Sequence, residues 1–170
     1  MVLVPVSFLL YQSTKLSNFA EVFMPKKPTT ADAEIVLKLY DFRREAEMRK
    51  ARNWFNGQFW PKSADDIIAV TSDFSKPENA WFRQVVTYWD MTAALVLHGA
   101  LNEDLFFASS AELWFSFAKL YPHAKAYREK SGQPDAWKQL EKMATNTKQG
   151  KTRLENLVKR VTAMGAAQKG

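Results

Sequence analysis

The sequence is poor in the side chains that usually carry catalysis or hold metals. It contains two histidines and no cysteine in 170 residues, so neither a disulfide framework nor a thiolate metal site can form. His98 and His123 lack the spacing of a di-iron helix pair, and no phosphate loop, dinucleotide fingerprint or nucleophile elbow occurs. We therefore predict no catalytic residue, no metal ligand and no cofactor, and we favour a protein that is not an enzyme.

One carboxylate stands in the most apolar segment of the chain. Asp90 belongs to residues 77–98, where nearly every helical face is apolar. An ionised carboxylate in such a segment needs hydrogen bonds and a positive partner. Arg43 and Arg44 flank an apolar stripe of an earlier helix, so they are the expected partners. We interpret this buried polar pair as an ion pair that fixes the helix register, with a catalytic carboxylate as the alternative.

Tryptophans near Asp90 suggest a second interpretation. Trp81, Trp89 and Trp114 are candidate lining residues of a pocket around the Asp90 carboxylate. This alternative makes the protein a helical small-molecule-binding module or an enzyme. It predicts an enclosed cavity with converging polar groups.

The positive charge is concentrated towards the C-terminus. The chain carries a net charge of +6, and residues 119–170 hold 12 Lys or Arg against 4 Asp or Glu. This asymmetry is typical of contact with an acidic partner, although charge that only keeps a helix soluble gives the same pattern. Lys151, Arg153, Lys159 and Arg160 are the candidate contacts. Nucleic acid bound through these basic C-terminal helices is a weaker alternative.

Apolar residues recur at helical spacing, and no strand-like alternation exceeds four residues. We predict an all-α fold, an irregular bundle of five or six helices around the central apolar helix 77–98. The first long helix is expected over about residues 33–59, with Thr30 or Asp32 as its cap and Pro61 after its end.

Local signals also predict the ends of later helices. Ser109 and Glu112 have the spacing of a capping box, as do Thr152 and Glu155, so each pair should start a helix. Pro122 should kink or end the helix that precedes it. One helix is expected to begin at Pro134. The last helix of the chain is expected to end at Gly165.

Composition divides the chain into three regions. We predict an N-terminal apolar arm and loop over residues 1–29, a helical core domain over 30–131 and basic C-terminal helices over 132–170. Three interpretations of the arm remain: it packs on the body or a partner, it makes peripheral membrane contact, or it is the end of a longer membrane helix. We favour the packed arm.

Three stretches, ADAEIVLKLYDFRREAEMRKARNWF, WFRQVVTYWDM and LNEDLFF, resemble a family of uncharacterised bacterial domains of unknown function that are all-helical. The resemblance extends over about residues 32–130. It implies a helical fold, in some members after an N-terminal membrane segment, and it carries no activity.

Together these observations favour a non-catalytic helical interaction, scaffold or accessory-subunit protein. We expect a protein partner or a homo-oligomer, because apolar and basic surfaces are present without catalytic motifs. A chain without cysteine fits a reducing compartment, so we expect the cytoplasm, with the cytoplasmic face of the membrane as the alternative.

Overall fold

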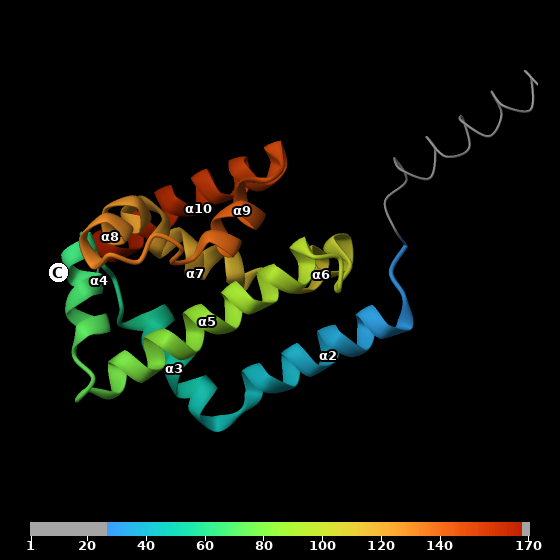
Figure 1. The fold of residues 1–170 in the computed structure, drawn as a ribbon, viewed down its shortest axis with the longest axis horizontal. Coiled ribbons are helices and arrows are strands. Elements are labelled where there is room, and N and C mark those ends of the chain that lie inside the picture. The colour runs from blue at the N-terminus through green and yellow to red at the C-terminus, as the bar shows by residue number, and fades with distance from the viewer. Residues whose placement is uncertain (1–26, 168–170) are drawn as a thin grey trace, which may run out of the picture.

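The computed structural model describes residues 27–167, and all regular secondary structure in this range is helical (Figure 1). The prediction of an all-α fold is therefore confirmed. The helices are α2 (Thr30–Arg44), α3 (Ala46–Gly57), α4 (Ala64–Ser72), α5 (Pro77–Leu97), α6 (Glu103–Ser109), α7 (Glu112–Leu120), the 3-10 helix η1 (Tyr121–His123), α8 (Ala124–Ser131), α9 (Lys138–Thr145) and α10 (Lys148–Ala167). The first 26 residues of the predicted arm lie outside the described residues.

Helix α5, the apolar helix of the sequence analysis, packs against α3, α4, α6 and α9. In Figure 1 it runs between α2 and α3 on one side and α7, α9 and α10 on the other. Val85, Trp89 and Ala93 are buried, Trp89 with 1% of its surface exposed. Pro77 occupies the first turn, and Gly99 follows the helix with a φ of +71°, a left-handed conformation that favours glycine.

The expected helix over residues 33–59 is two helices. Glu45 adopts an extended conformation with φ −55° and ψ 143°, which separates α2 from α3. Its carboxylate accepts a hydrogen bond from the backbone N–H of Met48 and so caps α3. The start of α2 is also corrected, because Thr29 is the cap and Asp32 completes its capping box. Breaks of this kind give the fold more helices than the five or six that were expected.

Helix ends in the C-terminal half follow the sequence in part. Helix α7 ends at Leu120, and Pro122 lies in η1, as expected. Helix α9 begins at Lys138 rather than Pro134, because Trp137 before it is left-handed with a φ of 59°. Helix α10 continues beyond Gly165 to Ala167, so the predicted end at this glycine is wrong.

The basic C-terminal helices share the core of the preceding helices. Helix α9 packs on α5, and α10 packs on α7 and α9. Leu140, Met143 and Leu154 are fully buried in these contacts. The predicted division between residues 131 and 132 therefore marks a change in charge, while the packing continues across it.

Candidate functional site

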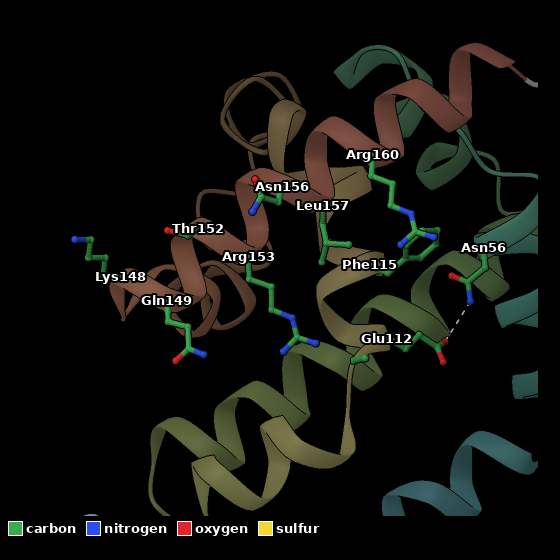
Figure 2. Close-up of a pocket in the computed structure, with 11 residues that line it drawn as sticks. Asn56, Glu112, Phe115, Lys148, Gln149, Thr152, Arg153, Asn156, Leu157 and Arg160 are labelled. Atoms are coloured by element: carbon green, nitrogen blue, oxygen red, sulfur yellow. Dashed lines mark hydrogen bonds between the residues drawn. The ribbon is translucent and has the colours of Figure 1, made fainter.

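An open groove of about 1390 Å³ lies between α7 and the first turns of α10. Figure 2 shows the side chains that line it, which come from both helices and from the end of α3. The lining residues are Asn56, Ala111, Glu112, Phe115, Lys148, Gln149, Thr152, Arg153, Asn156, Leu157 and Arg160. Three of them are basic and one is acidic, so the groove presents positive charge around apolar side chains.

The wall formed by α10 carries two arginines on one helical face. Arg153, Leu157 and Arg160 are spaced by four and three residues, which places them side by side along the helix. Figure 2 shows both guanidinium groups directed from α10 into the groove. The Arg153 guanidinium lies 5.2 Å from the ring centre of Trp114. Neither arginine forms an ion pair with any residue in the range 27–167, so both charges remain available to a ligand.

The opposite wall contains a partly buried ion cluster around Glu112. Arg43 of α2 and Arg52 of α3 both donate to the Glu112 carboxylate, with Arg52 Nε 2.7 Å from Oε1. Asn56 Nδ2 donates to the same oxygen at 3.3 Å, the dashed line in Figure 2. Burial alone would raise the pKa of Glu112, but the hydrogen bond from Arg52 and the charges of both arginines outweigh burial and lower it.

The predicted pair of Asp90 with Arg43 or Arg44 is replaced by other contacts. Asp90 Oδ1 accepts from the backbone N–H of Leu140 at 3.0 Å, in the first turn of α9. Arg43 binds Glu112 instead, and Arg44 is exposed, with its guanidinium 5.7 Å from the ring centre of Tyr40. The break at Glu45 explains the change, because it lets Arg43 and Arg52 converge on one carboxylate.

Asp90 therefore caps a helix from a distance. Trp137, which precedes α9, provides no side-chain cap, and the half-buried Asp90 carboxylate supplies the missing acceptor. Burial raises the pKa of Asp90, while the N–H groups of Leu140 and Gln139 and the charge of Arg128 oppose the rise. The group is a structural acceptor at the start of α9.

The three candidate pocket tryptophans lie apart from one another. Trp81 packs on Trp54 at the edge of the core. Trp89 packs on Tyr88, and Trp114 packs on Phe107. Both tryptophans are fully buried. The structure does not gather them around Asp90, because Trp81 and Trp89 of α5 pack on different neighbours and Trp114 belongs to α7.

The four basic residues predicted to contact an acidic partner separate into two sets. Arg153 and Arg160 line the groove. Lys151 and Lys159 are exposed on α10 outside it. Residues one or two positions apart on a helix do not face the same way, so the two lysines present their charge to a different surface.

Lys119 is a buried cation that sequence reasoning missed. Only 2% of its surface is exposed, and its Nζ donates to the carbonyl oxygens of Phe55, Asn56 and Phe59 at 2.7 to 2.9 Å. Burial lowers the pKa of its amine to about 7. A lone lysine in a segment that is apolar on nearly every face was the available signal, because such a residue must find acceptors.

A second, smaller cavity of about 490 Å³ adjoins Lys119. Trp60, His123 and Gly165 are among its lining residues. The three carbonyl acceptors match the three N–H bonds of an ammonium group, so the charged form of Lys119 uses all of its donors to hold the end of α3. We therefore assign this lysine a structural role.

The described residues contain neither a cluster of metal-ligating side chains nor a helix that could span a membrane. No group of three or more His, Cys, Asp or Glu side chains there is placed to hold a metal ion. None of the helices between residues 27 and 167 combines the length and the apolar character needed to cross a bilayer.

Most of the described chain matches a family model. The model described as "Domain of unknown function (DUF4760)" matches residues 28–147. This range contains the ion cluster around Glu112 and all of α7, and it ends directly before α10. Comparison with curated proteins and with solved structures finds no match.

Proposed function

We propose, from the premise that this chain belongs to the DUF4760 family of domains of unknown function, that it is a non-catalytic helical interaction protein. In this proposal the groove between α7 and α10 binds an acidic segment of a partner protein. The observation that carries the proposal is the pair Arg153 and Arg160. Both guanidinium groups are directed into one groove, and neither forms an ion pair with a described residue.

The size and chemistry of the groove support a peptide rather than a small molecule. Its volume of about 1390 Å³ exceeds the roughly 300–1,000 Å³ that is usual for small-molecule pockets. Phe115 and Leu157 provide apolar surface between the basic side chains. A partner segment that combines carboxylates with apolar side chains matches both features, because charge complementarity favours encounter and apolar burial adds affinity.

A non-catalytic role is supported by how the polar groups of the interior are used. Asp90 caps α9, Glu112 is held by two arginines, and Lys119 binds three carbonyls. Each group has a structural task, and a catalytic carboxylate or amine would need to reach a substrate. We place the protein in the cytoplasm as part of this proposal, since the chain contains no cysteine.

The test is a binding titration with matched charge reversals on one helix. The probe is a fluorescent peptide that contains glutamate and leucine, followed by anisotropy. R153E/R160E should weaken its binding by at least about tenfold, because both groove charges are reversed. K151E/K159E changes the net charge equally but lies outside the groove, so it should change affinity by less than about twofold.

Other outcomes decide between the proposal and its rivals. Equal losses in the two double variants would mean that net charge, rather than the groove, attracts the peptide. Absence of binding by the wild-type chain would overturn the proposal. A duplex DNA probe that binds more tightly than the peptide, with affinity falling steeply with salt, would instead support nucleic-acid binding.

A further inference from the structure

We infer that the acidic segment bound in this groove is an amphipathic α-helix whose carboxylates lie seven residues apart. The inference rests on the proposed function and adds the conformation and the spacing of the ligand. It follows from the register of the side chains along α10, the absence of a strand edge in the described chain and the position of the apolar surface.

The register of α10 sets the spacing. Arg153 and Arg160 are separated by seven residues, or two helical turns, which is a rise of roughly 10.5 Å along the axis. A helix that lies alongside α10 has the same rise per residue. Acidic residues at its positions i and i+7 can therefore contact both guanidinium groups at the same time. The two-turn pattern is the same in either chain direction, so it fits a parallel or an antiparallel helix.

The apolar surface lies between the two charges. Leu157 is between Arg153 and Arg160 on the same face, and Phe115 of α7 lies opposite it. On a ligand helix, residues i+3 and i+4 lie between i and i+7 on one face. Leucines at these positions would contact Leu157 and Phe115 while the flanking acids reach the arginines. The groove thus reads one face of a helix in the order acidic, apolar, acidic.

The groove offers an extended peptide less. An extended segment gains much of its affinity from backbone hydrogen bonds to the edge of a sheet, and residues 27–167 contain no strand. A helix satisfies its own backbone groups and presents only side chains, as recognition in a groove between helices requires. Lining residues from Lys148 to Arg160 extend roughly 18 Å along α10, enough for about three turns of ligand helix.

Arg153 is held ready for this ligand. Its guanidinium stacks over Trp114, which is fully buried. Stacking on a fixed aromatic ring limits the rotamers of the arginine before binding and so reduces the entropy that binding would cost. The groove thereby has one arginine oriented by the core and a second two turns along the same face.

The test compares three peptides of identical composition with the full chain by anisotropy. The first has glutamates at i and i+7 and leucines at i+3 and i+4. The second moves one glutamate to i+5, on another face of the helix. All three peptides contain one proline, which lies outside the helical segment in the first two. In the third, this proline and a central alanine exchange positions, so that the proline breaks the helix. We expect the first peptide to bind at least about tenfold more tightly than either of the others.

The protein variants separate failure of this inference from failure of the proposed function. If R153E/R160E weakens the first peptide by at least about tenfold and K151E/K159E does not, the ligand occupies the groove. If all three peptides bind equally and all depend on Arg153 and Arg160, the proposed function stands and the helical inference is overturned. If no peptide binds, or if binding ignores both arginines, the proposed function fails as well.

Discussion

The ammonium group of Lys119 lies 3.5 Å from the ring centre of Trp60. The same group donates to three carbonyl oxygens at the end of α3, so α7 holds that helix end through one side chain. A cation over an indole face is favourable, more so when water is excluded. Lys119 therefore supplies the positive charge that the C-terminal end of a helix dipole favours, from a residue far away in the sequence.

Replacement of this lysine should destabilise the protein strongly. Lys119→Met retains most of the apolar stem but leaves three carbonyl groups without their donor. We expect a loss of about 2–4 kcal/mol in the free energy of unfolding, because buried polar groups without partners are costly. Urea denaturation at pH 6, where the amine is charged, measures it. Lys125→Met is the control on the exposed surface of α8 and should stay within about 0.5 kcal/mol of the wild type.

Glu112 should make stability sensitive to acid. Its pKa is lowered below the ordinary value of 4.5 in the folded protein. The carboxylate therefore contributes stability that is complete above pH 4.5 and is lost as the pH falls through the folded pKa. Glu112→Gln should cost about 1–3 kcal/mol at pH 7 and progressively less in acid. Denaturation curves at pH 7 and in acid measure this convergence.

The matched control for Glu112 is an exposed pair. Glu47 forms an ion pair with Lys50 on the surface of α3. Glu47→Gln should leave the unfolding curves unchanged at both pH values, because exposed pairs contribute little. A wild type and a Glu112→Gln variant that differ by the same amount at every pH would show that the ionisation of Glu112 does not stabilise the fold.

Asp90 should act through α9 rather than through an arginine. Asp90→Ala removes the acceptor of the Leu140 N–H and should cost about 0.5–2 kcal/mol, as loss of a helix cap does. Asp90→Asn keeps an acceptor oxygen and should cost less. Hydrogen exchange at the Leu140 amide gives a local readout, with faster exchange in the alanine variant. Unchanged exchange in Asp90→Ala would show that this contact does not protect the start of α9.

The pH dependence of Asp90 has the opposite sign to that of Glu112. Burial raises its pKa above 3.8, so the folded state holds this proton more tightly than the unfolded chain does. The contribution of the protonated carboxyl group to the free energy of unfolding is complete below pH 3.8 and declines as the pH rises through the folded pKa. Asp90→Asn should remove this decline from the stability profile.

The fold was predictable from local signals, whereas the contacts that build the site depend on tertiary structure. Pro77 and Gly99 bound α5 because their backbone preferences act on the chain next to them. Glu112 has the spacing of a capping residue, but α7 begins after Ala111, and two arginines from α2 and α3 occupy its carboxylate. No local pattern contains that information, because the partners are separated from Glu112 by 60 or more residues.

The groove was predictable in charge but not in position. The excess of basic residues after Lys119 pointed to α10, yet two of its four candidate residues face away from the groove. Which face of α10 lies against α7 is decided by Leu154 and Val161, which are buried. The residue at which α10 starts does not determine which of its faces lies against α7. The placement of Arg153 and Arg160 in the groove therefore depends on tertiary packing.

Gly150 should tolerate no side chain. A Cβ atom there would lie 2.9 Å from the carbonyl oxygen of Ala144 and 3.2 Å from Cη2 of Trp114. Because the first of these atoms belongs to the backbone, α9 and α10 would have to move apart. We expect Gly150→Ala to cost about 1–3 kcal/mol despite the better helix propensity of alanine. Thermal or urea unfolding measures the loss.

Gly57→Ala is the matched control for this substitution. Gly57 ends α3, and a Cβ atom there would meet nothing within 4 Å, so alanine should be neutral or stabilise by up to about 1 kcal/mol. Gly150→Ala should also weaken binding of the acidic peptide, because a displaced Trp114 ring would no longer hold the Arg153 guanidinium in its orientation. A Gly150→Ala protein that unfolds and binds like Gly57→Ala would show that α9 and α10 are not packed as closely as the structure places them.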